Sequence, residues 1–101
     1  MNESQLKEQI ELGSITKIEF KTVIFDTGLD FCIAAHVAHT PPENEGFLIR
    51  NSNRSQSIKF FKSLNKAMNF VRAAGWNEDI IISPPKGTHA ANITADYYKN
   101  A

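Results

Sequence analysis

The chain is organised around residues 47–77, which read FLIRNSNRSQSIKFFKSLNKAMNFVRAAGWN and contain no Asp or Glu. Five aromatic residues and six cationic residues alternate along this stretch. The cationic residues are Arg50, Arg54, Lys59, Lys62, Lys66 and Arg72. Residues 1–46 carry eight carboxylates against three lysines, and the whole chain has a formal net charge of zero. Two explanations stay open: the acidic part neutralises the basic part, within one molecule or between two copies, or the basic part binds an anionic partner.

The later part of this stretch predicts the main helix of the protein. Ser63 is a favourable N-cap, and Gly75 is a typical helix stop. Between them, apolar residues recur at helical spacing, which predicts an amphipathic helix whose cations lie on the solvated side. The apolar stripe consists of Leu64, Ala67, Met68, Val71 and Ala74. We therefore expect a helix over about residues 63–74.

The earlier part predicts a basic hairpin. Residues 47–50 and 57–61 have the composition of strands, and the segment between them is rich in polar turn-forming residues.

The last predicted strand comes after the helix. Asp79 to Ser83 is a β-branched run that ends at two prolines, which predicts a further strand. The connection through the helix is long enough for a crossover, so we expect this last strand to run parallel to the strand at 57–61.

Two more strands are predicted upstream. Residues 15–26 alternate with period two, and residues 31–39 follow after a Gly-containing connection in which Asp26 and Asp30 are interpreted as turn residues. The second strand has a core side and a side of smaller residues, namely Cys32, Ala34, His36 and Ala38. Before these strands, residues 2–12 have apolar residues four apart, a capping pair at Asn2 and Gln5, and a stop at Gly13, which predicts a short helix.

Together these elements predict an α+β fold in a single domain of 101 residues. We expect an antiparallel sheet of three to five strands, with the main helix packed on one face and the short N-terminal helix docked beside it. Residues 86–101 are predicted to form either a docked helix or a flexible tail.

One segment resembles a known kind of protein. Residues 60–67, FFKSLNKA, and residues 70–75, FVRAAG, followed by a β-branched strand, resemble a strand–helix–strand element of small uncharacterised accessory proteins from plasmids, integron cassettes and other mobile elements. The resemblance covers about a quarter of the chain, and Asn65 stands where those proteins often have an acidic residue. It implies a mobile-element accessory protein and brings no catalytic residue with it.

Catalytic and metal-binding chemistry is not predicted. Cys32, His36 and His39 are ligand types that zinc prefers, but residues alternate between the two faces of a strand, so His39 points away from the other two. Cys32 and His36 are too far apart on one strand face to form a nucleophile–base pair. Phosphate-cradling glycine loops and nucleophile elbows are absent from the sequence. We therefore expect no catalytic residue, no metal and no cofactor.

The function that we expect first is a non-catalytic module for protein interaction or self-association, as a homodimer. Apolar residues lie on both sides of residues 23–25 and 80–82, where a second copy would cover them. The candidate interface residues are Val23, Phe25, Tyr97 and Tyr98.

Two alternatives remain open. The first is nucleic-acid binding by the basic hairpin, although a sequence pI of about 6.8 lies well below the value typical of dedicated nucleic-acid modules. Its candidate residues are Arg50, Arg54, Lys59, Lys62 and Lys66. The second is a small-ligand binder or enzyme that uses a cavity beside the small-residue side of the second strand.

The sequence gives no sign of a membrane or an export route. Its apolar runs fall short of the ~18 residues that span a bilayer, and residues 1–11 lack the features of a signal peptide. A single cysteine also agrees with a reducing compartment. We therefore expect a cytoplasmic location.

Overall fold

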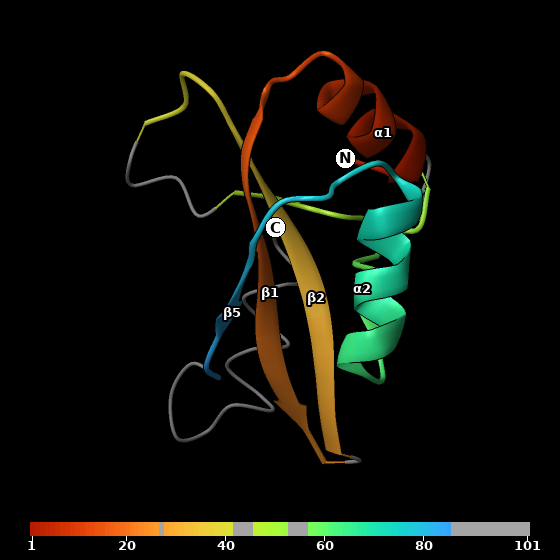
Figure 1. Cartoon of the computed structure of the whole chain (residues 1–101). Helices are drawn as coiled ribbons and strands as arrows, with labels where there is room; N and C mark the ends of the chain where they lie inside the picture. The colour runs from red at the N-terminus through yellow and green to blue at the C-terminus, as the bar shows by residue number, and fades with distance from the viewer. Residues whose placement is uncertain (27, 42–45, 53–56, 86–101) are drawn as a thin grey trace.

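The computed structural model describes residues 1–26, 28–41, 46–52 and 57–85. In these residues the chain has an α+β fold with two helices and one mostly antiparallel sheet (Figure 1). The predicted fold class is therefore confirmed. The alternatives for residues 86–101 lie outside the described residues.

The centre of the sheet is a long antiparallel hairpin made by β1 (Ile15–Phe25) and β2 (Gly28–Val37). Phe25 pairs directly with Gly28, whose φ of 127° is readily adopted only by glycine. The connection is thus only two residues long, and the predicted longer turn is wrong. Asp30 lies inside β2, paired with Val23, and is not a turn residue.

Two short strands continue the sheet on the outer side of β2. β3 (Phe47–Leu48) and β4 (Phe60–Phe61) both pair with it, and both are shorter than predicted. They are short because the chain leaves the sheet between them and pairs with itself. The backbone N–H of Lys59 donates to the Ile49 carbonyl at 2.9 Å, and Arg50 and Ile58 form an isolated bridge. The base of the predicted basic hairpin is therefore present, as an excursion from the sheet.

The last strand, β5 (Ile80–Ser83), pairs in parallel with β1, which gives the strand order β3-β2-β1-β5 with β4 also on β2. Both β4 and β5 therefore run antiparallel to β2, so the parallel orientation predicted from the crossover is confirmed. They are not neighbours, however, because the β1–β2 hairpin lies between them.

Both helices contribute to one face of the sheet. α1 (Glu3–Glu11) begins with the predicted capping box at Asn2 and Gln5, and α2 (Leu64–Ala73) begins with the predicted Ser63 cap. In Figure 1, α2 lies beside β2 and α1 lies beyond one end of the hairpin. The main core joins the helices to the sheet and includes Leu6, Ile18, Phe20, Ile33, Ala67 and Val71. Leu64, expected in the apolar stripe, is instead 38% exposed.

A second apolar cluster lies on the opposite face. It consists of Val23, Cys32, Ala34, Leu48 and Ile58, with Phe25 and Phe60 packed against it. The rings of Phe25 and Phe60 meet edge to face, with centroids 5.2 Å apart. Cys32 and Ala34, on the small-residue side of β2, are therefore part of a core and not an open surface.

Candidate functional site

The cations of the basic hairpin have different surroundings and do not share one partner. Lys62 forms an ion pair with Asp30 at 3.1 Å, and the Asp30 side chain is only 8% exposed. The ammonium group of Lys59 lies 5.6 Å from the ring centroids of both Phe61 and Phe70. Lys66 lies exposed in the first turn of α2. Arg54 lies outside the described residues.

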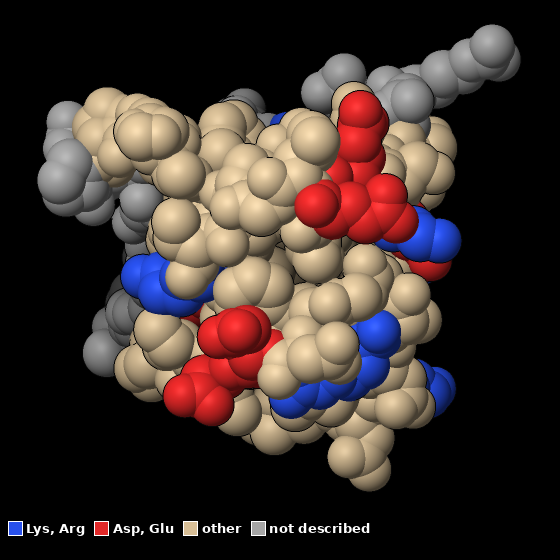
Figure 2. Space-filling model, turned by 45° about the horizontal axis from the view of Figure 1, so that its top comes forward, with Lys and Arg blue, Asp and Glu red and all other residues tan. Residues whose placement is uncertain are grey.

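These contacts weaken the case for one continuous basic surface. Asp30 neutralises one of the cations from within the chain, and Arg72 donates to the carbonyls of Trp76 and Glu78, where it closes the end of α2. Figure 2 shows acidic and basic side chains interspersed on the face that it draws. Nucleic-acid binding through Arg50, Lys59, Lys62 and Lys66 therefore stays a prediction without a structural feature that favours it.

A polar cluster links three strands on the face opposite the helices. With its proton on Nε2, the His36 ring donates to Oε1 of Glu19 at 3.0 Å, while the Ser83 hydroxyl donates to the other carboxylate oxygen. The side chains of His36 and Glu19 are 14% and 16% exposed. Burial alone would raise the pKa of Glu19, but the hydrogen bonds from Ser83 and His36 and the charge of Lys21 lower it below its usual value of 4.5.

The arrangement of this cluster is that of a clamp and not of a catalytic relay. Ser83 and His36 bind different oxygens of Glu19, so the imidazole is not bonded to the hydroxyl that it would have to activate. Groups of three or more potential ligands that could hold a metal ion are absent from the described residues. Glu19 therefore holds β5 and β2 to β1.

Glu19→Gln is expected to lower the free energy of unfolding at neutral pH by about 1–3 kcal/mol, because hydrogen bonds to a charged group are lost. The lowered pKa means that the stabilisation from the Glu19 carboxylate is complete above pH 4.5 and is lost as the pH falls through the lower native pKa. Urea unfolding at a series of acidic pH values should give a flatter pH dependence for the variant. The exposed Glu11→Gln provides the control, and an unchanged slope for Glu19→Gln would contradict the clamp.

The two edges of the sheet differ. On the β3 side, the Met1 nitrogen donates to the Leu48 carbonyl at 3.1 Å and the Arg50 N–H donates to the Met1 carbonyl at 2.8 Å, so the chain covers its own edge. On the other side, β5 is the outermost strand of the described sheet. Ile81 and Ile82 on this strand are 46% and 52% exposed.

The two candidate interface residues that the structure describes, Val23 and Phe25, lie in the second apolar cluster. Val23 is completely buried in the second cluster of its own chain, which removes it from the surface that a partner could cover. Phe25 is half-buried against Phe60. Tyr97 and Tyr98 lie outside the described residues. Of the predicted apolar surface, Ile24 at 37% exposed and the two isoleucines of β5 remain exposed.

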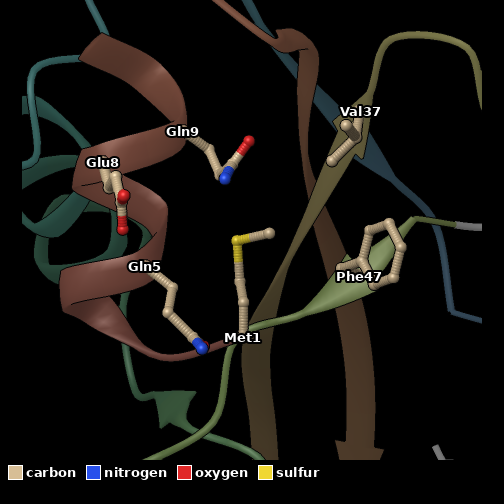
Figure 3. Close-up of a pocket in the computed structure, with 6 residues that line it drawn as sticks. All are labelled: Met1, Gln5, Glu8, Gln9, Val37 and Phe47. Atoms are coloured by element: carbon tan, nitrogen blue, oxygen red, sulfur yellow. The ribbon is translucent and has the colours of Figure 1, made fainter. Parts of the chain in front are cut away.

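Two hollows bear on the small-ligand alternative. A groove of about 500 Å³ lies between α1 and the ends of β2 and β3 (Figure 3). A smaller hollow of about 390 Å³ lies around His36, Ala38 and His39 at the end of β2. His39 has a φ of 69°, which turns the chain there and brings both histidines to this hollow. The sequence prediction that the two point apart does not anticipate this turn.

Comparison of the chain with protein-family models, with curated proteins and with solved structures gives no match. In the part of the chain that the structure describes, neither helix is long and apolar enough to cross a membrane.

Proposed function

We propose that the protein is a small self-associating module that forms a homodimer by pairing β5 of one copy with β5 of a second copy. The observation that carries this proposal is the position of β5 at the edge of the sheet, with Ile81 and Ile82 about half exposed. Adjacent residues of a strand point to opposite faces, so each isoleucine extends a different face of the sheet. An apolar edge strand of this kind is a ready template for another strand.

A second copy of the same strand fits this edge by symmetry. Alternate residues of β5 direct their N–H and C=O groups away from β1, so the outer edge offers both donors and acceptors. An antiparallel pair of identical strands is self-complementary and closes after two copies, as a two-fold interface requires. The resulting sheet would continue from β1 of one copy to β1 of the other.

The expected dimer is weak. Covering the exposed half of four isoleucine side chains contributes on the order of 4 kcal/mol, since full burial of one contributes about 1.5–3 kcal/mol. A strand of four residues followed by two prolines adds only a few backbone hydrogen bonds. Because lost translational and rotational freedom opposes association, we expect dissociation in the micromolar to millimolar range.

Sedimentation velocity over this concentration range tests the proposal. The wild-type chain is expected to shift from monomer to dimer as the protein concentration rises. In Ile81→Lys this transition should need a protein concentration at least about tenfold higher, because each copy places a buried cation between the two β5 strands. Ile81→Thr keeps a β-branched residue in the strand and should show a smaller shift in the same direction. Leu12→Lys is the matched control, because Leu12 is 69% exposed but lies at the end of α1. A wild-type chain that stays monomeric throughout, or equal effects of Ile81→Lys and Leu12→Lys, would overturn the proposal.

We also propose that this module belongs to a mobile element and acts in the cytoplasm. The resemblance of residues 60–75 to accessory proteins of mobile elements supports a role in such an element. The buried thiol of Cys32 agrees with a reducing, cytoplasmic environment. Neither point depends on the geometry of β5.

A further inference from the structure

The two ends of β5 are attached to the protein in different ways. Before the strand, the Arg72 side chain donates to the carbonyls of Trp76 and Glu78. The Trp76 indole N–H donates to the Asp79 carbonyl at 3.1 Å. Ile80, the first residue of the strand, packs against the main core. These contacts fix the chain where it enters the sheet from α2 (Figure 1).

The other end of β5 has less apolar contact. Ile81 and Ile82 are about half exposed, so they contribute little burial. Two prolines follow Ser83, and proline lacks the N–H that would continue the ladder. A side-chain hydrogen bond from the Ser83 hydroxyl to Oε2 of Glu19 joins this end to β1. The attachment of this end is therefore sensitive to the charge of one carboxylate.

Neighbours on the same face of the sheet keep Glu19 ionised. His36 faces it from β2, with Nε2 3.0 Å from Oε1, and Lys21 lies two residues along β1, where it pairs with Ser83. β5 itself has no charged residue. Burial favours the neutral form, but the hydrogen bonds from Ser83 and His36 and the charges of Lys21 and His36 outweigh it, so the pKa of Glu19 lies below its usual value of 4.5.

From this arrangement we infer that Glu19 is a proton-controlled latch for the end of β5. With the carboxylate ionised, the Ser83 end of the strand lies against β1. With the carboxyl group protonated, this end leaves the sheet, while the beginning of the strand stays anchored near Trp76. A neutral carboxyl group accepts weaker hydrogen bonds than a carboxylate, and a segment with little apolar burial opens more readily than a core strand.

The proton and the end of β5 compete for the same carboxylate. Detachment of Ser83 removes a hydrogen bond that favours the charged form, so Glu19 binds a proton more tightly when the strand is detached. A falling pH therefore shifts the strand toward the detached state. The consequence for self-association rests on the proposed function, because a strand that has left β1 no longer offers an ordered edge to a second copy.

Hydrogen exchange of the β5 amides that bond to β1 tests the latch, whether the chain is monomeric or dimeric. We expect their protection, corrected for intrinsic exchange, to fall about tenfold as the pH drops from neutral to well below 4.5, the effect of losing one hydrogen bond to a charged group. The β1–β2 amides should keep their protection. Glu19→Gln should have the low β5 protection already at neutral pH, and the exposed Glu11→Gln should behave as wild type. Wild-type β5 protection that does not change with pH would overturn the latch.

Ser83→Ala separates the latch from a general weakening of the fold. It leaves the bond between Glu19 and His36 intact, so β5 should lose protection at neutral pH while β1 and β2 keep theirs. Unchanged β5 protection in this variant would overturn the latch.

Sedimentation velocity of the same variant links the latch to self-association. Ser83→Ala should need a protein concentration about two- to tenfold higher to dimerise, because fewer chains offer an ordered β5. A dimer that forms as in the wild type although β5 has lost protection would support the latch and contradict pairing through β5. Dimerisation weakened without loss of β5 protection would overturn the latch and leave the proposed function standing.

Discussion

Replacement of Phe20 by alanine is expected to lower the free energy of unfolding by about 3–5 kcal/mol, the cost of removing a large side chain from a packed core. Phe20 is completely buried and is the largest of the fully buried side chains. It lies in the middle of β1, paired with Ile33 on one side and Ile82 on the other, and belongs to the core that α1 and α2 cover. Loss of its ring therefore affects both layers of the fold at once.

Urea unfolding followed by circular dichroism measures this effect. Because domains of this size have total stabilities of about 5–15 kcal/mol, the variant is expected to fold but with a much lower midpoint. Phe47→Ala removes the same side chain from an exposed position and should cost less than about 1 kcal/mol. Similar losses for the two variants would contradict the placement of the core on the helix side of β1.

The elements that the sequence predicts well are those whose signals are local. Asn2 and Gln5 lie three residues apart in the capping box, and Ser63 caps α2 through the N–H of Lys66. Gly13 and Gly75 both have positive φ at the helix ends. These contacts act within one turn of the chain, so a pattern of a few residues is sufficient to find them.

Two polar contacts that the sequence did not predict depend on distant partners. Asp30 and Lys62 are 32 positions apart, and Glu19 and Ser83 are 64 positions apart. Neither pair follows a periodic pattern, because the contacts exist only once β5 has paired with β1 and the chain has returned to β2. The charge pattern alone therefore left open both neutralisation by the acidic part and a basic binding surface, whereas the fold pairs Lys62 with the buried carboxylate of Asp30.

The groove between α1 and the ends of β2 and β3 shows the same division. The side formed by Gln5, Glu8 and Gln9 follows from their spacing on a predicted helix. The side formed by Val37 and Phe47 does not, since these residues come near α1 only through the antiparallel pairing of β2 with β3. A groove made from one helix face and two strand ends requires the topology as well as the pattern.

Replacement of Leu6 by alanine is expected to cost about 2–5 kcal/mol, with the loss concentrated in α1. Leu6 is the one fully buried residue of this helix, which has nine residues and is too short to be stable without docking. Hydrogen exchange should show the amides of α1 losing protection before those of β1 and β2. Leu12→Ala, at a position that is 69% exposed, is the control. Unchanged protection of α1 in Leu6→Ala would contradict the role of this side chain as its anchor.

The same variant tests whether the β5 edge acts independently of α1. β5 lies at the edge of the sheet away from β3, so the dimer of Leu6→Ala should persist at the concentrations where the wild-type chain associates. Ile81→Lys should have the opposite result, with α1 still protected from hydrogen exchange and the dimer weakened. A Leu6→Ala chain that no longer dimerises while β1 and β2 stay protected would mean that β5 pairing depends on α1.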